Sequence, residues 1–258
     1  MGHPSLELSS KTAVVIGGTS GIGLAIAQGL AQAGANVIPT GRRPELVDAA
    51  AEQIKHLGGR TLAVPCDVTN HSSVQSLCAA ARAEFGEVEI LVNCAGVTKR
   101  KPTLEVSDSE WNSILETNLN GTLRACQVFG RHMIERNYGR IINIASIASF
   151  VGLYEVAAYT ASKAAVAGLT RSLAIEWARY GVCVNAIAPG VFRTDLNSAL
   201  LDGTPRGEEF RLRTPMQRFG KLDELAGAAV FLASDAASFV TGHLLAVDGG
   251  FLASGVNQ

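Results

Sequence analysis

The sequence lacks an excess of charge of either sign and lacks any cluster of metal-binding side chains. Lys and Arg number 22 against 23 Asp and Glu, which gives a formal net charge of −1. A balance this close to neutral does not indicate nucleic acid or another charged polymer as a partner. The five histidines are scattered without the spacing of metal ligands, so we expect no metal site.

The sequence also lacks a cysteine pattern typical of disulfides or zinc sites. Its five cysteines are odd in number, widely spread and contain no Cys-x-x-Cys pair. Scattered cysteines of this kind are typical of reduced, buried thiols, and we therefore expect a cytoplasmic protein. The cysteines are Cys66, Cys78, Cys94, Cys126 and Cys183.

Charge is absent from residues 12–41, a stretch long enough to cross a bilayer. Glycines at Gly17, Gly21 and Gly23 interrupt this stretch, and polar side chains such as Gln28 follow. A strand, a glycine turn and a helix explain the pattern better than a membrane span does. We therefore expect no membrane segment.

Short apolar runs alternate with helical patterns along the whole chain. This alternation predicts an α/β fold, with one doubly wound domain over residues 1–258 and a parallel seven-stranded sheet flanked by helices. In such a sheet the ligand lies over the carboxyl ends of the strands. The 258 residues, 47% of them apolar, are enough for a sizeable core. We expect strands over residues 13–16, 36–40, 61–65, 89–92, 140–145, 182–187 and 243–247.

The first expected strand runs into a glycine-rich turn with the spacing Gly17-x3-Gly21-x-Gly23, and a helix follows. Glycine permits a tight turn and lets backbone amides approach a phosphate, which the positive end of the next helix also favours. The pattern indicates a dinucleotide site, although a purely structural turn is an alternative reading.

The second strand ends in Gly41-Arg42-Arg43 and carries no acidic residue there. An acid at this position would bind the ribose 2′-hydroxyl of NAD, whereas arginine pairs with the 2′-phosphate of NADP. We therefore expect NADP as the preferred cofactor, with NAD as the alternative. Asp67, after residues 61–65, is a candidate acceptor for the adenine amino group or a helix-entry residue.

Tyr159 and Lys163 are four residues apart in a helical pattern and share one face of the helix. A cation about 4 Å from a phenol favours the phenolate by about 4 kcal/mol at an effective dielectric of about 20. Such a contact would lower the pKa of Tyr159 toward neutral pH, where general acid/base catalysis is most effective. Ser146 would end the preceding strand with its hydroxyl at the same spot. Alone, the pattern is short, and a surface tyrosine with a turn serine also explains it.

Two further features of the sequence, a polar residue within an apolar helix and a long connection, have more than one interpretation. Asn118 is a polar residue amid leucines in an expected helix over residues 111–123, so its amide needs partners, usually backbone or water. Residues 191–221 include an irregular pattern from residue 195 onward, and connections this long in compact domains are often functional. We expect this segment to form a lid over the substrate.

Taken together, the motifs resemble the short-chain dehydrogenase/reductase family over essentially the whole chain. The resemblance implies a Rossmann-type domain in which Tyr159 is the general acid/base, Lys163 lowers its pKa and Ser146 orients the substrate. It also implies that Asn118 holds a water that links Lys163 to solvent. Ile16 and Cys94 depart from the residues that the family usually has there. The motifs are Gly17-x3-Gly21-x-Gly23, Asn93-x-Ala95-Gly96, Asn118, Ser146, Tyr159-x3-Lys163 and Pro189-Gly190.

The resulting expectation is an oxidoreductase that transfers a hydride between a nicotinamide cofactor and a secondary alcohol or ketone. The expected catalytic residues are Asn118, Ser146, Tyr159 and Lys163. The expected cofactor-binding residues are Gly17, Thr19, Ser20, Gly21, Ile22, Gly23, Arg42, Arg43, Asp67, Val68, Asn93, Ala95, Gly96, Tyr159, Lys163, Pro189, Gly190, Val191 and Thr194.

Within the family, the chain looks closest to sugar-acid enzymes such as gluconate 5-dehydrogenase and 2-deoxy-gluconate dehydrogenase. Lys99, Arg100 and Lys101 follow a strand end beside the expected nicotinamide site, and Arg100 or Lys99 could clamp a carboxylate. The alternative is that these charges only keep a loop soluble.

Two other functions fit the same motifs: a 3-oxoacyl-carrier-protein reductase, and a nucleotide-binding sensor without turnover. The family resemblance also implies a homotetramer.

Overall fold

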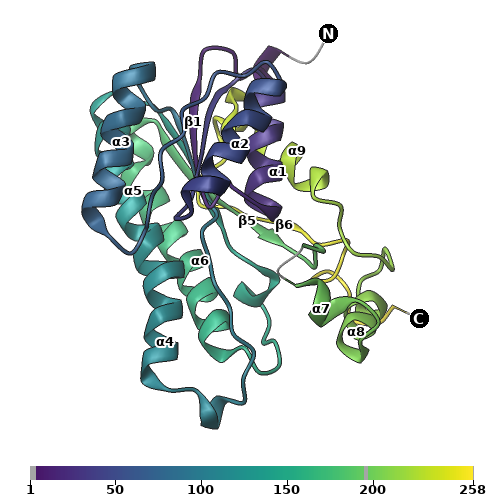
Figure 1. The fold of residues 1–258 in the computed structure, drawn as a ribbon. Helices are drawn as coiled ribbons and strands as arrows, with labels where there is room; N and C mark the ends of the chain where they lie inside the picture. Colours follow the sequence, from purple (N-terminus) through teal and green to yellow (C-terminus); the bar gives the residue numbers. More distant parts are fainter. Residues whose placement is uncertain (1–3, 195–196, 258) are drawn as a thin grey trace.

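A six-stranded parallel sheet forms the centre of the protein in the computed structural model, which describes residues 4–194 and 197–257 (Figure 1). The order of its strands is β2-β1-β3-β4-β5-β6. This order confirms the predicted doubly wound architecture, because strands on the two sides of β1 are reached by crossovers in opposite directions. The strands are β1 (Thr12–Ile16), β2 (Asn36–Thr40), β3 (Ile90–Asn93), β4 (Gly139–Ile144), β5 (Val182–Pro189) and β6 (Leu244–Val247).

The inner strands are buried on both faces, as their apolar and mainly β-branched sequences predict. Their register brings the carboxyl ends of the strands into line. Ile16 of β1 pairs with Thr40 of β2 and with Asn93 of β3, and Asn93 in turn pairs with Asn143 of β4. The loops that follow these ends therefore meet along one edge of the sheet.

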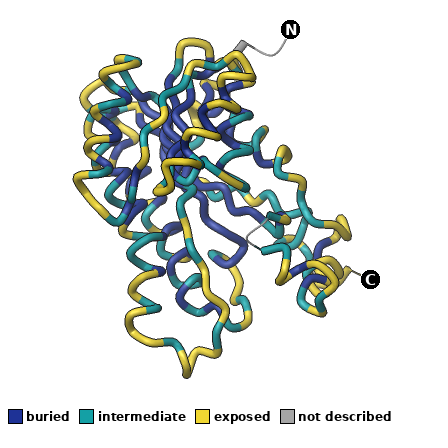
Figure 2. Tube along the Cα trace, in the orientation of Figure 1, coloured by how far each residue is buried: buried dark blue, intermediate teal, exposed yellow. Residues whose placement is uncertain are grey.

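Helices cover both faces of the sheet (Figures 1 and 2). One face is packed against α1 (Gly21–Gln32), α2 (Pro44–His56) and α9 (Asp223–Ala233). The other face is packed against α3 (His71–Phe85), α5 (Gly121–Glu135) and α6 (Ala157–Trp177), and α4 (Asp108–Leu115) lies beyond α5. Among the described residues, no helix combines the length and the apolar character needed to cross a membrane.

The prediction of a seventh strand over residues 61–65 is wrong. This segment lies beside β2 and is joined to it near its two ends, by Val37 N to Arg60 O at 3.0 Å and Cys66 N to Gly41 O at 2.9 Å. Alternate amides of β2 donate to opposite sides, so the next donor toward the segment after Val37 would be Pro39. Proline has no N–H, and the ladder is interrupted at its centre.

The prediction that residues 195–221 are irregular is also wrong for much of the segment. It contains α7 (Ser198–Leu201) and α8 (Pro205–Arg213), which form a separate lobe near the C-terminus (Figure 1). The Thr204 hydroxyl caps α8 by accepting from Gly207 N at 3.0 Å, and Pro205 occupies the first turn. Residues 195 and 196 of the predicted lid lie outside the described residues.

Candidate functional site

Tyr159 and Lys163 lie in the first two turns of α6, beside the carboxyl end of β4. Lys163 is buried, with 5% of its surface exposed, and its ammonium donates to the carbonyl oxygen of Ile144 at 2.6 Å. The same ammonium lies 5.7 Å from the centroid of the Tyr159 ring. The two side chains therefore share one face of the helix, as their spacing predicts.

The electrostatics of this pair differ from the prediction. Burial raises the pKa of Tyr159, and the hydrogen bond with the Ser146 hydroxyl only partly opposes this effect. Burial lowers the pKa of Lys163 to about 8, with the neighbouring Cys94 acting in the opposite direction. The ammonium is bonded to the Ile144 carbonyl instead of the phenol, so desolvation outweighs the expected stabilisation of the phenolate.

Ser146 follows β4 by two residues and begins a short turn of 3₁₀ helix, Ile147–Ser149. It is buried, and its hydroxyl accepts a hydrogen bond from Ala148 N at 3.1 Å. This bond leaves the hydroxyl proton free to point toward an acceptor. Ser146 and Tyr159 are thus brought together from sequence positions thirteen residues apart.

Asn118 lies in a π-helical turn, Glu116–Asn120, that joins α4 to α5. The helix predicted over residues 111–123 is therefore interrupted at this residue. The Asn118 amide holds the Val97 backbone at both ends: its oxygen accepts from Val97 N at 2.8 Å and its nitrogen donates to Val97 O at 2.9 Å. The nitrogen also donates to the Ser162 hydroxyl at 3.0 Å. Protein groups therefore take both N–H groups of this buried side chain and one lone pair of its oxygen.

Gly96 lies between the side chains of Asn118 and Lys163 and is close to both. A Cβ atom built on Gly96 would lie 3.4 Å from the Asn118 side-chain oxygen and 3.6 Å from the Lys163 ammonium. Cys94 is close as well, since the charge of Lys163 influences it, and burial raises the pKa of its thiol to about 11. Ser162, which directly precedes Lys163, is a partner of Asn118 that the sequence motifs did not indicate.

The glycine turn after β1 is built for close approach of backbone atoms. Gly17 and Gly21 have positive φ values, 81° and 51°. A Cβ atom on Gly17 would lie 2.5 Å from Ala95 N, and one on Gly23 would overlap the Gly17 carbonyl oxygen. The turn delivers the first amides of α1 without any acidic side chain beside them. This cradle fits a diphosphate.

The other turn residues serve the same cradle. Ser20 is the N-cap of α1 but makes no side-chain capping bond to it. The Thr19 hydroxyl would lie 3.1 Å from a Cβ atom on Gly41, so the turn touches the end of β2. Ile22 packs into the core beneath the turn.

Arg42, Arg43 and Asp67 lie at the end of the sheet expected to hold adenosine. Arg42 and Arg43 are exposed, and neither forms an ion pair with a described residue. Burial acts to raise the pKa of Asp67, but hydrogen bonds from Thr69 and the charge of Arg42 hold it below its usual value. Val68 is buried, and a Cβ atom on Gly121 would meet its side chain at 2.7 Å.

Asn93, at the end of β3, does not point toward the cofactor cradle. Its buried amide donates to the Asn143 side chain at 2.9 Å, and Asn143 donates to Thr170 Oγ1 at 2.9 Å. This network ties β3, β4 and α6 together, and only the backbone of Asn93 remains beside the turn. Ala95 packs against the core below Gly17.

Pro189, Gly190, Val191 and Thr194 continue from the end of β5. A Cβ atom on Gly190 would lie 2.7 Å from the Asp248 Cα atom, so this turn also depends on a glycine. The Thr194 methyl group would lie 3.2 Å from a Cβ atom on Gly21. Thr194 therefore closes the cradle from the side opposite β2.

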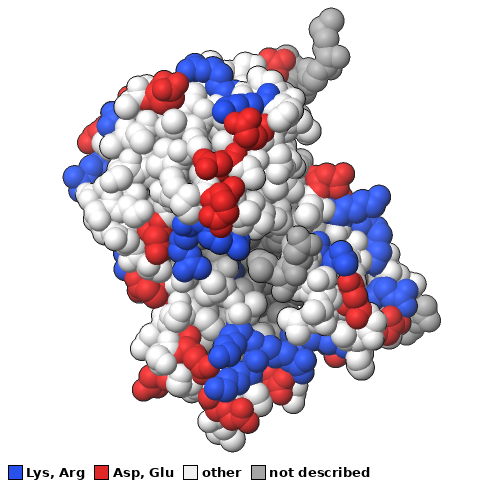
Figure 3. All heavy atoms as spheres, viewed as in Figure 1, with Lys and Arg blue, Asp and Glu red and all other residues white. Residues whose placement is uncertain are grey.

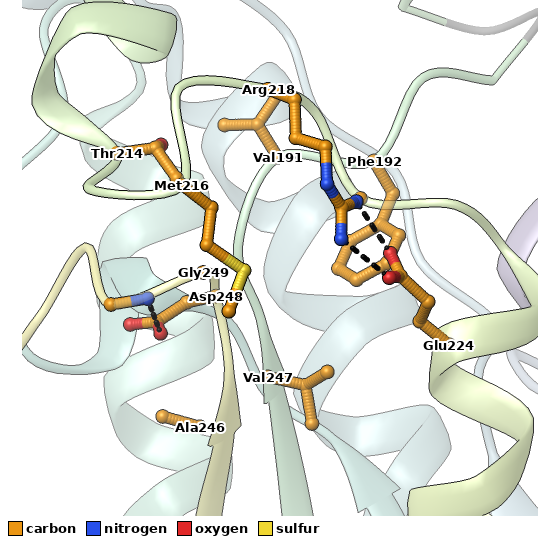
Figure 4. A pocket seen from close by; sticks show the side chains of 12 residues that line it. Val191, Phe192, Thr214, Met216, Arg218, Glu224, Ala246, Val247, Asp248 and Gly249 are labelled. Atoms are coloured by element: carbon orange, nitrogen blue, oxygen red, sulfur yellow. Dashed lines mark hydrogen bonds and ion pairs between the residues drawn. The ribbon is translucent and has the colours of Figure 1, made fainter.

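A separate pocket of about 350 Å³ lies where the segment after α8 meets β6 (Figure 4). Arg218 crosses its rim and donates to both carboxylate oxygens of Glu224, at 2.8 and 2.6 Å. Val191 is the one predicted site residue in its wall. The pocket therefore borders the β5 side of the cradle and does not contain the Tyr159 cluster.

The basic run after β3 lies on the surface next to the catalytic candidates. Lys99 and Lys101 both pair with Glu110, at 2.5 and 3.1 Å, and Arg100 pairs with Glu155 at 2.8 Å. Figure 3 shows basic side chains gathered on the lower part of the drawn face. The two lysines share one carboxylate, and the side chains of Lys99 and Arg100 remain 57% and 40% exposed.

Comparison with known proteins gives matches over nearly the whole chain. A family model described as enoyl-(acyl carrier protein) reductase matches residues 17–252. Gluconate 5-dehydrogenase of Gluconobacter oxydans is 40% identical over 255 residues, covering 98% of this chain and 100% of that protein. D-threitol dehydrogenase of Mycolicibacterium smegmatis is 44% identical, with 95% of this chain and 94% of that protein covered.

A solved structure is also similar over nearly the whole chain. Gluconate 5-dehydrogenase of Burkholderia cenocepacia, in complex with NADP and tartrate, superimposes with a TM-score of 0.93 at 39% identity. The match covers 97% of this chain and 98% of that one.

Proposed function

Because this chain belongs to the short-chain dehydrogenase/reductase family, we propose that it is an NADP-dependent oxidoreductase that interconverts a secondary hydroxyl of a gluconate-type sugar acid and the corresponding ketone. The observation that carries this proposal is the group formed by buried Ser146, buried Lys163 and half-buried Tyr159, which stands beside a glycine cradle fit for a diphosphate. The gluconate dehydrogenases among its relatives support the substrate class.

In this proposal Tyr159 is the general acid/base. Its raised pKa keeps the phenol protonated at neutral pH, so it can donate a proton to a ketone oxygen that Ser146 holds by its hydroxyl. When bound, NADP or NADPH supplies the hydride acceptor or donor. Lys163, with a pKa of about 8, is cationic at neutral pH and favours loss of the Tyr159 proton in the direction of alcohol oxidation.

Asn118 takes a positioning role in the same proposal. By holding both backbone groups of Val97 it fixes the loop that begins at Gly96 against Lys163. Both N–H groups of its side-chain amide are taken, so a water near Lys163 can bond only to an oxygen of Asn118. The side-chain oxygen accepts from Val97 N, and the main-chain oxygen accepts from the Thr122 hydroxyl at 2.8 Å, which leaves each oxygen one lone pair.

We propose NADP as the preferred cofactor, held by the residues predicted from the sequence. Arg42 and Arg43 are exposed at the end of β2 and form no ion pair with a described residue, although the charge of Arg42 reaches Asp67, so both can bind a 2′-phosphate. The relative from Burkholderia cenocepacia, solved with NADP, supports this preference.

For the substrate carboxylate we propose Arg100 as the first partner. Both Arg100 and Lys99, the other candidate from the sequence, are ion-paired, Arg100 with Glu155 and Lys99 with Glu110. We place Arg100 first because its planar guanidinium can donate to both oxygens of a carboxylate, whereas the Lys99 ammonium is a point charge. Tartrate, a dicarboxylate, accompanies NADP in the Burkholderia cenocepacia structure. Unchanged KM values for the best acidic substrate in both Arg100→Ala and Lys99→Ala would contradict a carboxylate clamp in this loop.

A neutral polyol is the second candidate substrate, because D-threitol dehydrogenase is among the similar proteins. Initial rates of NADP and NAD reduction with gluconate, related sugar acids, threitol and simple secondary alcohols separate the two. We expect turnover with the acids and faster reduction of NADP than of NAD. Turnover confined to neutral alcohols would reject the sugar-acid proposal and retain the oxidoreductase.

We further propose a single-domain cytoplasmic homotetramer in which residues 191–221 close over the substrate. The free cysteines support the location. Ile175 on α6 is 83% exposed, which leaves an apolar side chain for a partner subunit to cover. Light scattering and small-angle X-ray scattering on the purified protein test the assembly.

A further inference from the structure

One arginine of the predicted lid has no acidic partner. Arg206 is the second residue of α8, it is half-buried, and it forms no ion pair with any residue that the structure describes. Its guanidinium donates to the Tyr154 carbonyl oxygen at 3.2 Å and lies 5.3 Å from the Phe210 ring centroid. A cation near the start of a helix faces the positive end of the helix dipole, which is locally unfavourable.

The start of α8 holds this arginine in a fixed place. A Cβ atom on Gly207 would overlap the Leu201 carbonyl oxygen, so the glycine lets α8 pack directly against α7. Thr204 caps the same turn. The backbone under Arg206 is therefore tied to its neighbours, and a substitution at Arg206 changes the side chain more than the helix.

A second arginine, Arg100, also lies close to Tyr154. The guanidinium of Arg100 lies 5.9 Å from the Tyr154 ring centroid, and its Nε donates to Glu155 at 2.8 Å. Burial lowers the pKa of Arg206 and the charge of Arg100 lowers it further, against the influence of Glu209 and Glu155. The two guanidinium groups are thus close enough for their charges to interact, and among the described residues the only ion pair that either forms with an acid is that of Arg100 with Glu155.

The pair formed by Arg100 and Arg206 lies next to the proposed active site. Glu155 lies two residues before α6, the helix that carries Tyr159, and its carbonyl accepts from Lys101 N at 2.8 Å, which joins the two loops. Arg100 is four residues beyond Gly96, which touches Lys163. In Figure 3 basic side chains gather on the lower part of the drawn face.

We propose that Arg206 is a specificity-determining residue that, together with Arg100, binds the carboxylate of the sugar acid at the mouth of the active site. The inference deepens the proposed function and rests on it. Arginine presents its donors in a planar fork that matches both oxygens of a carboxylate. An anion between the two guanidinium groups removes their mutual repulsion and holds α8 over the substrate.

The test compares Arg206→Ala and Arg206→Lys with Arg213→Ala, a control at the far end of α8 whose arginine is exposed and paired with Glu209 at 2.9 Å. With NADP saturating, kcat/KM for gluconate should fall roughly 10- to 100-fold in Arg206→Ala, mainly through KM. Threitol should change less than about 3-fold, and Arg206→Lys should recover part of the loss. Equal losses for both substrates, or no loss, would overturn the inference.

Calorimetric titration of gluconate and threitol into the NADP-loaded enzyme separates this inference from the proposed function. Gluconate binding that weakens in Arg206→Ala, in an enzyme that does not oxidise gluconate, would retain the inference and reject the function. Gluconate oxidation that is indifferent to Arg206 would retain the function and reject the inference. A wild-type enzyme that neither binds nor oxidises any sugar acid would reject both.

Discussion

Replacing Lys163 by methionine should make the folded protein more stable at neutral pH. Burial lowers the pKa of Lys163 from 10.5 to about 8. Because a difference of one in pKa corresponds to about 1.4 kcal/mol, the buried cation costs the folded state about 3 kcal/mol relative to the unfolded chain. Methionine removes this cost but leaves the Ile144 carbonyl without its donor, which costs about 1–3 kcal/mol.

The pH dependence isolates the charge, since the lost hydrogen bond to Ile144 is a constant term. The folded pKa of Lys163 lies below the unfolded value, so the cost is complete below about pH 8 and disappears as the pH rises toward 10.5. The stability advantage of Lys163→Met over wild type should therefore shrink by about 2 kcal/mol between about pH 7 and about pH 9.5.

Equilibrium urea denaturation at fixed protein concentration, without cofactor, measures this change. Lys55→Met is the control, because Lys55 is exposed on α2 and its replacement should change the free energy of unfolding by no more than about 0.5 kcal/mol. A difference between wild type and Lys163→Met that stays constant or grows with pH would refute the conclusion that the fold holds Lys163 charged against desolvation.

Three other variants test the cofactor and proton roles. Tyr159→Phe should lower kcat by about 10²- to 10⁴-fold while NADPH binding, followed by fluorescence, is unchanged; near-normal turnover would contradict its acid/base role. The double variant R42A/R43A should raise KM for NADP roughly 10-fold or more and leave KM for NAD unchanged, so equal effects on both would exclude 2′-phosphate recognition. Gly23→Ala should lose NADP affinity and lower the Tm, because the added methyl overlaps a backbone carbonyl of the turn. Gly227→Ala, on the exposed side of α9 with open space around it, is the control and should be neutral or stabilising by up to about 1 kcal/mol.

Most of the fold could be predicted from local sequence, because buried strands and a glycine turn leave local patterns. The segment over residues 61–65 has such a pattern but forms no strand. The reason lies in another strand, where Pro39 cannot donate the hydrogen bond that would join the two. Strand propensity in one segment does not show whether its neighbour can pair with it.

In the candidate site, too, some features follow from local sequence and others depend on residues elsewhere in the chain. The spacing of Tyr159 and Lys163 predicted that they share a helix face, but the direction of the Tyr159 pKa shift depends on burial and on the Ile144 carbonyl. Arg206 is distant in sequence from every catalytic motif. Its relation to Arg100 exists only because α8 folds back to the loop before α6.

The central claim is direct hydride transfer between a sugar acid and NADP, and an isotope label tests it most directly. Gluconate deuterated at all its carbon-bound positions is incubated with the enzyme and NADP, and the cofactor is analysed by mass spectrometry. We predict NADPH that carries one deuterium, with none formed by Tyr159→Phe in the same time. Cofactor that remains oxidised, or is reduced without deuterium while unlabelled neutral polyols react, would contradict the assignment of a sugar-acid dehydrogenase.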